Sequence, residues 1–373
     1  MNLEKNGGIQ MNTISANKEK ESKTPHIIKL PHHKDDYECM WNGVEDLYMQ
    51  KTGEKLPSNF FFSLASFGSF CYMRTENSEP KRLVSLGDGR TKQMFEFLSP
   101  IVGFKYKFYE CSTAEKAIKK AKAEIDNGYP VMLGALDMFY LSYYKKIYHT
   151  EHIPFHYVLM IGYNDKTENI TILDCGRKEA QELSYNELTQ AWNCSYPGLS
   201  KPFTLCTIRM ENTKSKKQIA KEALKKKADM FLYPPVGFIG YKGFDKFIME
   251  LPKWKSQLGV ESYKKQLFNM VQFYGAVPTI PNALRGINEP DEIVFGGGFD
   301  KISHILSELG KEYKNNDYKA AAKSFSDGIA VTEEIKKIIV EYLTNMNDET
   351  NRLPTLYMKM KNIMIDGFSK LGY

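Results

Sequence analysis

The feature of this 373-residue sequence that most restricts its fold is a pair of β-rich runs joined by a short polar turn. The runs read FHYVLMIGY, from Phe155, and NITILDCG, from Asn169, and the segment between them reads NDKTE. Branched and aromatic residues favour extended strands, whereas small polar residues favour turns. The pattern therefore predicts an antiparallel hairpin whose two strands lie side by side.

The predicted hairpin places a histidine beside an acidic residue. With the turn centred near Lys166, His156 and Asp174 fall within about one rung of each other. His156 alternates with Val158, and Asp174 alternates with Ile172, so both side chains can leave the same face of the sheet. An acidic residue beside a histidine fixes the tautomer of the ring and stabilises its charged form, as in acyl-transfer triads.

A cysteine precedes an amphipathic run earlier in the chain. The sequence YECMWNGVEDLYMQKTG predicts a helix from Cys39 to Gln50, which Gly53 ends. The free N–H groups at a helix start favour a thiolate and can hold an oxyanion. The alternative is a buried structural thiol. A Cys on a helix, followed by a His and an Asp on a sheet, resembles the papain arrangement.

The rest of the region from residue 26 to 212 mixes helices and strands. STAEKAIKKAKAEIDNG predicts a helix with a capping box made by Ser112 and Glu115 and a stop at Gly128. YPVMLGAL and PFTLCTIRM predict further strands, and LSYNELTQAW predicts a short helix. This alternation indicates a compact α+β region.

The sequence changes character near residue 212. Residues 213–373 have a nearly continuous helical pattern, which predicts a mainly helical accessory domain. Its first segment, residues 214–227, is rich in Lys and forms either a solvated helix face or a docking site for an acidic carrier protein. Residues 1–25 are polar and aperiodic, which predicts a disordered tail.

Composition excludes several classes of protein. The net charge of +6 is modest, and the aromatic residues do not alternate with Arg, so nucleic-acid binding is not expected. No long apolar run or signal-peptide core occurs, which predicts a cytoplasmic protein without a membrane span. The six cysteines form no CxxC pair, so reduced thiols are expected. Strand parity turns Cys175 away from Asp174 and into the core, and the four cysteines other than Cys39 and Cys175 are also interpreted as structural.

Two further motifs favour a structural interpretation. His149, His152 and His156 would share one face of a helix, as a metal site requires, but the sequence that follows them is typical of a strand. FGGGFDKISHI lacks the pattern of a phosphate-binding loop and indicates a flexible helix entry that ends at Gly298. No metal and no nucleotide are therefore expected.

A family resemblance rests on two of these runs. DYECMWNGVEDLYMQKTGEKLPSNFFFSLASFGSFCYM, from Asp36, and HYVLMIGYNDKTENITILD, from His156, resemble the N-terminal domain of the butirosin-biosynthesis acyltransferase family. The helical region after residue 212 is similar to the accessory domain of that family. The resemblance implies a papain-like cysteine-peptidase fold with a mainly α-helical C-terminal domain.

The resemblance also implies an activity and its residues. An acyl group would move from a carrier-protein thioester, through an acyl-cysteine, to an amine. Cys39 matches the nucleophile, His156 the general base and Asp174 the residue that orients the histidine. No bound cofactor is implied, because the phosphopantetheine belongs to the acyl or peptidyl carrier protein. The acceptor would be a small amine, such as an aminoglycoside or a di- or polyamine.

The segment before the cysteine departs from the papain pattern. Papain-like enzymes usually carry a Gln about six residues before the Cys, as an oxyanion donor, and this position is His33 here. We expect His33 to donate in its place. Asp35, Asp36 and Glu38 crowd the thiol with negative charge, which would raise its pKa unless they point to solvent or to a cationic substrate. In the second case they would form an acidic rim that attracts an ammonium group.

Two other functions stay open at this point. A papain-like peptidase or amide hydrolase, similar to the bacteriocin-leader peptidases, would use the same three residues with water as the acceptor. The absence of an export module and of the Gln disfavours it. A non-catalytic binding protein with a vestigial cleft is the second alternative.

Overall fold

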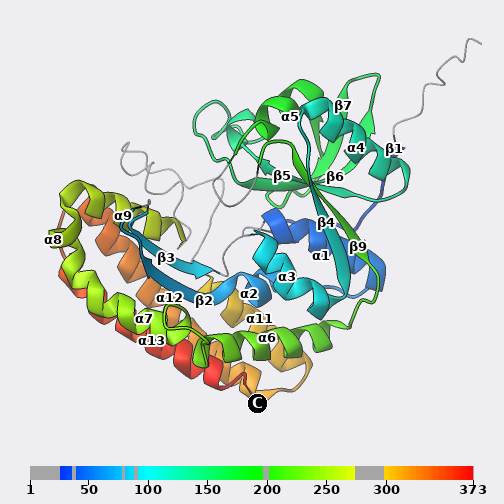
Figure 1. The fold of residues 1–373 in the computed structure, drawn as a ribbon. Coiled ribbons are helices and arrows are strands. Elements are labelled where there is room, and N and C mark those ends of the chain that lie inside the picture. Colours follow the sequence, from blue (N-terminus) through cyan, green and yellow to red (C-terminus); the bar gives the residue numbers. More distant parts are fainter. Residues whose placement is uncertain are drawn as a thin grey trace, which may run out of the picture.

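The computed structural model describes residues 26–35, 39–77, 80–87, 91–195, 201–273 and 298–372. Figure 1 shows two regions: a sheet with helices on both faces, and a crescent of helices that continues from it. The protein is therefore an α+β protein, as predicted. The predicted tail over residues 1–25 and the Gly-rich run before Gly298 lie outside the described residues.

The main sheet has seven strands among the described residues, and they follow the order β4-β9-β5-β6-β7-β8, with β1 paired to β6. The strands are β1 (His26–Ile27), β4 (Phe104–Glu110), β5 (Val131–Leu136), β6 (His156–Asn164), β7 (Asn169–Leu173), β8 (Gln181–Ser184) and β9 (Thr204–Met210).

The predicted hairpin is present as β6 and β7. The two strands pair antiparallel, with Tyr163 opposite Ile170 and Leu159 opposite Leu173. The register shifts between Met160 and Gly162, which indicates a β-bulge. The pairing brings the start of β6 next to the end of β7, as the sequence predicts.

Helices cover both faces of this sheet (Figure 1). The helices α1 (Cys39–Thr52) and α3 (Thr91–Val102) share one apolar core with one face of the sheet. On the other face, α4 (Ala114–Asp126) and α5 (Tyr185–Trp192) form a second core. Alternate strand residues enter the two cores: Leu159 joins the first, whereas Val158 and Met160 join the second.

Helix ends follow local sequence signals, with one correction. Gly53 follows α1 with a φ of 72°, and Gly128 follows α4 with a φ of 83°, a region in which glycine is favoured. The cap of α4 is Thr113, whose side chain accepts from the backbone N–H of Lys116, and not Ser112 as predicted. The helix therefore starts one residue later than a cap at Ser112 would require.

The region after residue 212 is mainly helical, as predicted. Its helices are α6 (Lys216–Leu232), α7 (Gly240–Glu250), α8 (Trp254–Leu258), α9 (Val260–Phe273), α11 (Phe299–Glu312), α12 (Asn316–Leu343) and α13 (Leu353–Ser369). Among the described helices, none combines the length and the apolar character needed to cross a membrane.

An earlier part of the chain packs against these helices. The helix α2 (Phe60–Ala65) leads into a separate hairpin of β2 (Phe67–Arg74) and β3 (Arg82–Gly87), which lies against the crescent in Figure 1. Phe70 of β2 stacks on Phe244 of α7, with ring centroids 3.8 Å apart, and Phe67 meets Phe325 of α12 edge-on. The core of the helical region thus includes residues from before the change of sequence character near 212.

Candidate active site

Cys39 is the first residue of α1 and carries a free thiol. Its side chain is partly buried, and Sγ lies 4.0 Å from the carbonyl oxygen of Phe155. Phe155 directly precedes His156, so the helix start and the start of β6 face each other. The first N–H groups of a helix have no partners within it, which leaves polar donors beside this sulfur.

His156 and Asp174 form a buried pair beside that thiol. Nε2 of His156 lies 2.7 Å from Oδ2 of Asp174, and the two residues are 4% and 1% exposed. Since Nε2 is engaged by the carboxylate, Nδ1 is the ring nitrogen left for Cys39. The prediction that His156 and Asp174 lie close together is confirmed.

The charge state of His156 depends on both neighbours. Burial by itself lowers the pKa of this imidazole, but the charges and hydrogen bonds of Asp174 and Cys39 outweigh it and raise the pKa to about 10. The thiol is thus close enough to interact with the ring directly. His156 is therefore an imidazolium at neutral pH, next to the Cys39 thiol.

Asp174 is held by donors from two segments besides His156. The hydroxyl of Tyr143 donates to Oδ2 at 2.7 Å, the hydroxyl of Tyr144 donates to Oδ1 at 2.8 Å, and the N–H of Gly176 donates to Oδ1 at 3.1 Å. Burial raises the pKa of Asp174, but His156 and the two hydroxyls outweigh it, so the pKa is well below its ordinary value. Asp174 is therefore a carboxylate.

Sequence reasoning missed the two tyrosines. They lie in the connection between β5 and β6, where neither a strand nor a helix period marks which side chains face inward. A signal was present only in composition, because YLSYYKKIYH is dense in hydroxyl-bearing aromatic residues.

Cys175 corrects a prediction. Strand β7 ends at Leu173, so strand alternation does not extend to Cys175 and does not turn it to the far face. Burial raises the pKa of its thiol, and the charges of Asp174, Cys39 and Asp35 raise it further. Cys175 is therefore buried, as predicted, with a protonated thiol, but strand parity does not orient it.

His33 does not have the predicted role. Its Nδ1 lies 3.0 Å from Oδ1 of Asp46, and its Nε2 lies 2.9 Å from Oε2 of Glu45. Burial lowers the pKa of His33, but these carboxylates outweigh it and raise the pKa to about 10. Both ring N–H groups are used inside the protein, so His33 has none for an oxyanion.

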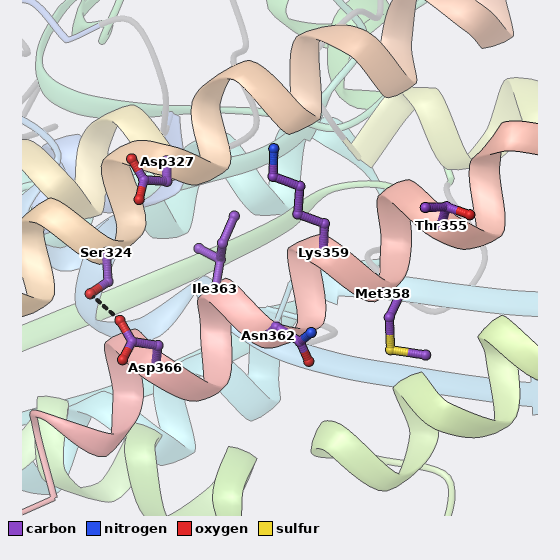
Figure 2. Close-up of a pocket in the computed structure, with 8 residues that line it drawn as sticks. All are labelled: Ser324, Asp327, Thr355, Met358, Lys359, Asn362, Ile363 and Asp366. Carbon is purple, nitrogen blue, oxygen red and sulfur yellow. Dashed lines mark hydrogen bonds between the residues drawn. The ribbon is translucent and has the colours of Figure 1, made fainter.

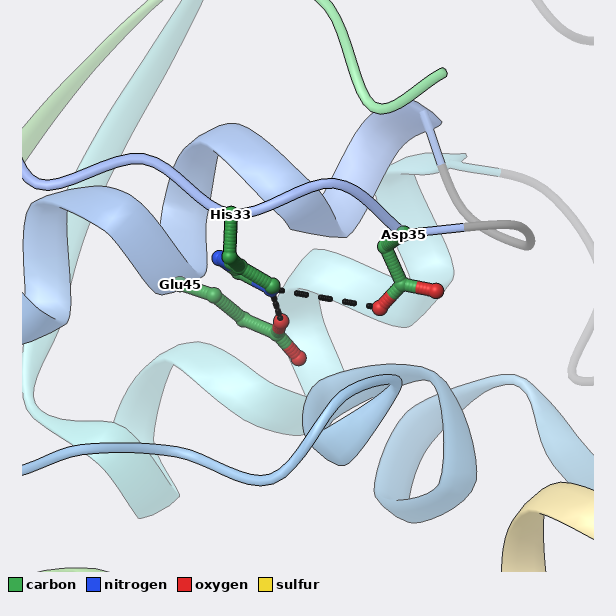
Figure 3. A group of neighbouring side chains, drawn as sticks. All are labelled: His33, Asp35 and Glu45. Atoms are coloured by element: carbon green, nitrogen blue, oxygen red, sulfur yellow. Dashed lines mark hydrogen bonds and ion pairs between the residues drawn. The ribbon is translucent and has the colours of Figure 1, made fainter. Parts of the chain in front are cut away.

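The same histidine belongs to a buried cluster with Asp35 and Glu45 (Figure 3). One donor atom from each lies within 4.8 Å of the others, which is compatible with a metal ion. These carboxylates, however, already accept hydrogen bonds from backbone N–H groups at the start of α2. Asp35 accepts from the N–H of Asn59 at 2.5 Å, and Glu45 accepts from the N–H of Phe61 at 2.7 Å. The cluster thus joins α1 to α2.

Of the three residues in the predicted acidic rim, the structure describes only Asp35. Asp35 is 4% exposed and faces this interior cluster, so it does not form part of an open rim. Asp36 and Glu38 lie outside the described residues. The expectation is therefore wrong for Asp35 and stays a prediction for the other two.

The histidines that suggested a metal site are not on one helix. A short 3-10 turn, Met138–Tyr140, precedes them, and His149 has a positive φ of 53°. Nδ1 of His152 bonds to Asp137 at 2.6 Å, whereas His156 bonds to Asp174. The segment is a connection between strands.

A groove lies elsewhere, on the helical region between α12 and α13 (Figure 2). Its volume is about 470 Å³. Its lining residues are Ser324, Asp327, Thr355, Met358, Lys359, Asn362, Ile363 and Asp366. Within it, the hydroxyl of Ser324 donates to Asp366. Neither Cys39 nor His156 contributes to this groove.

The fold and the site define an α+β protein in which a cysteine at a helix start faces a buried histidine–carboxylate pair on a sheet. Residues 38–175, which contain all three, match the family model described as Butirosin biosynthesis protein H, N-terminal. The resemblance predicted from the sequence is therefore confirmed over these residues.

A second family model matches the following part of the chain. Residues 186–277 match the model described as Domain of unknown function (DUF4872). The match begins in α5 and reaches past α9, so it crosses the change of sequence character near 212. No curated protein matches the chain significantly.

Proposed function

We propose that this protein is a cysteine-dependent acyltransferase. It takes an acyl group from a carrier-protein thioester onto Cys39 and passes it to an amine, so that an amide forms. The observation that carries the proposal is the Cys39 thiol beside His156, whose Nε2 is held by Asp174 at 2.7 Å.

In the first half-reaction, the Cys39 thiolate attacks the thioester carbonyl carbon. The bond between that carbon and the pantetheine sulfur then breaks, and the imidazolium of His156 gives its proton to the departing thiolate. In this proposal, the backbone N–H groups at the start of α1 stabilise the oxyanion. Because one thioester replaces another, this step is nearly balanced in free energy.

In the second half-reaction, the amine nitrogen attacks the acyl-cysteine. The acylated sulfur carries no charge, so one of the two groups that raise the pKa of His156 is lost. The histidine is then a better base and accepts a proton from the amine as the C–S bond breaks. Amide formation makes the sequence favourable, provided that water is kept from the acyl-cysteine.

The family match supports the setting of this chemistry. The matched family is described by a protein of butirosin biosynthesis, which makes an antibiotic pathway the proposed context. A carrier protein is the proposed donor, and the phosphopantetheine arm belongs to it. An aminoglycoside or a di- or polyamine is the proposed acceptor.

Intact-mass spectrometry tests the proposal. The protein is mixed with carrier proteins that hold candidate acyl groups, and we expect one acyl group to be added. Cys39→Ala should give no adduct, and His156→Ala should slow its formation by about 10²–10⁴-fold. Cys111→Ala, which removes another partly exposed thiol, should still be acylated. An adduct that persists in Cys39→Ala would exclude Cys39 as the nucleophile.

The same mixture separates transfer from hydrolysis. With an amine present, an acyltransferase should convert most of the donor into amide. If the donor is lost to water faster than to any amine offered, the site is that of a hydrolase. If no acyl-cysteine forms and Cys39→Ala retains biological activity, the protein is a binding protein.

A further inference from the structure

We propose that Tyr143 and Tyr144 are positioning residues of this site, whose hydroxyl groups share the charge of Asp174 and so let His156 release and regain its proton during transfer. The proposal rests on the function proposed above. It adds two residues that act on His156 through Asp174.

Both carboxylate oxygens of Asp174 accept hydrogen bonds from more than one group. A carboxylate oxygen has two principal acceptor directions. Oδ2 accepts from His156 and Tyr143, and Oδ1 accepts from Tyr144 and the backbone of Gly176. The charge is therefore shared among several donors, of which only one belongs to the histidine, and the Cys175 thiol also interacts with this carboxylate.

The two hydroxyls are fixed in place. The guanidinium of Arg177 lies 4.2 Å from the ring centroid of Tyr144 and donates to the carbonyl oxygen of Tyr143 at 2.7 Å. Gly176 has no side chain, and a Cβ atom there would lie 2.5 Å from the Tyr144 hydroxyl. The turn after β7 is thus shaped to admit this hydroxyl.

The same turn is attached to the helix that carries Cys39. Nε2 of His32 lies 2.9 Å from the carbonyl oxygen of Arg177, and its Nδ1 lies 2.6 Å from Asp46 of α1. The backbone N–H of Asp35 donates to the carbonyl oxygen of Cys175 at 2.7 Å. These hydrogen bonds therefore tie the turn that follows Asp174 to α1 and to the segment before it.

The tyrosine bonds act differently on the two forms of His156. When the ring is charged, it neutralises much of the Asp174 charge, and the hydroxyls interact with a weaker acceptor. When the ring is neutral, the buried carboxylate depends on the hydroxyls, and their bonds strengthen. The tyrosines therefore stabilise the neutral imidazole, which is the form that must accept a proton from the amine.

Several charged or titratable groups face the pair of His156 and Asp174. Cys39 and Asp35 belong to α1 and the segment before it, and Cys175 and Arg177 belong to the turn after β7. Tyr143 and Tyr144 belong to the connection before β6. The variants below differ from their common Cys39→Ala background only in the two tyrosine hydroxyls, so a change can be assigned to those hydroxyls.

A titration of His156 tests the proposal without any substrate. The background is Cys39→Ala, which lacks the thiolate as the acyl-enzyme does, and the ring is followed by NMR of ¹⁵N-labelled histidine, with His156→Gln to identify its signal. We expect Tyr143→Phe and Tyr144→Phe each to raise the pKa of His156 by about half a unit to one unit, and the double variant to raise it further. An unchanged or lowered pKa would overturn the proposal.

The matched control removes a hydroxyl from the same connection that does not bond to Asp174. Tyr140→Phe serves, because Tyr140 is not among the donors to this carboxylate, and it should leave the titration unchanged. The ring volume is kept in every variant, and thermal melts confirm that each is folded. A shift in Tyr140→Phe equal to that in Tyr144→Phe would show a general effect of the connection and contradict the proposal.

A second measurement uses the acyl-enzyme with wild-type Cys39. The rate of its aminolysis depends on the neutral form of His156, so the rise of this rate with pH should move to higher pH in both tyrosine variants. An equal loss at every pH, without that shift, would mean that the tyrosines only support the structure. If no acyl-enzyme forms, the proposed function fails, whereas the titration still decides the role of the tyrosines.

Discussion

Gly43 of α1 lies directly over Leu159 of β6. A Cβ atom on Gly43 would stand 3.0 Å from the Cβ of Leu159, closer than side chains ordinarily approach. The absence of a side chain at this position lets the helix approach the sheet closely. This contact sets the distance between the start of α1, with Cys39, and the start of β6, with His156.

A larger residue at position 43 should therefore separate the two elements that carry Cys39 and His156. We expect Gly43→Val to lower the free energy of unfolding by about 1–3 kcal/mol, because the helix and strand must move apart. The alkylation of Cys39 by iodoacetamide should also slow, because the thiol moves away from the imidazolium. Urea unfolding and mass spectrometry of the Cys39 peptide measure the two effects.

The control for this variant is an exposed glycine with room around it. A Cβ atom on Gly237 would meet nothing within 4 Å. Gly237→Val should change the unfolding free energy by no more than about 0.5 kcal/mol and leave alkylation unaltered. Normal alkylation in Gly43→Val would contradict a spacing role for Gly43.

Asp174→Asn should change the pH dependence of the thiol. Asp174 is the larger of the two influences that raise the pKa of His156, so its neutralisation should bring that pKa back toward lower values. Fewer molecules then hold an imidazolium at neutral pH, and the alkylation rate of Cys39 near pH 7 should fall about tenfold or more. Asp165→Asn, in the turn of the same hairpin, is the control. An unchanged profile between pH 5 and 10 would argue against the Asp174–His156 pair as the source of reactivity.

The stability of the protein should decrease on the alkaline side. The pKa values of His156 and His33 are raised to about 10, so their contribution is complete below about pH 6.5 and is lost as the pH rises toward 10. Glu45, raised to about 7, adds a loss that begins at lower pH. The lowered pKa of Asp174 adds stability to the folded state above about pH 4. The lowered pKa of buried Lys227 adds stability at alkaline pH and so offsets part of the loss from the histidines.

Denaturant unfolding at a series of pH values measures this dependence. In Cys39→Ala, one influence that raises the pKa of His156 is gone, so the alkaline loss contributed by this histidine should end at a lower pH and be smaller than in the wild type. Stability that stays level or rises from pH 6.5 to 10 would show that the buried histidines are not charged in the folded state.

The basic helix α6 offers a test of carrier docking. Lys217, Lys221 and Lys225 are exposed on it. If an acidic carrier docks there, replacing the three by Glu should lower the rate of acylation from the carrier-bound donor and weaken its dependence on salt. The rate with a free pantetheine thioester should be unchanged. An equal effect on both donors would place the change in the catalytic site, and no effect would exclude this face as the dock.

Much of the site follows from local patterns in the sequence. The alternation of residues in 155–163 and 169–173, with the polar turn between them, determines which strands pair and brings His156 close to Asp174. The apolar period after Cys39 and the stop at Gly53 determine a helix that begins at the cysteine. These features are local, because each depends on periods or caps within about 20 residues.

Tertiary packing decided the remainder. Tyr143 and Tyr144 reach Asp174 from a connection without any period, and His33 turns to Glu45 and Asp46 because buried carboxylates need a cationic partner. Cys175 lies beyond the end of its strand, so strand parity does not orient it, and the early hairpin of β2 and β3 joins the core of the helices that follow it in sequence. The sequence by itself thus determined the helix, the strands and the three residues to be brought together. Only tertiary packing decided which residues bond to these three and set their charges, because contacts between distant, irregular segments produce no periodic pattern in the sequence.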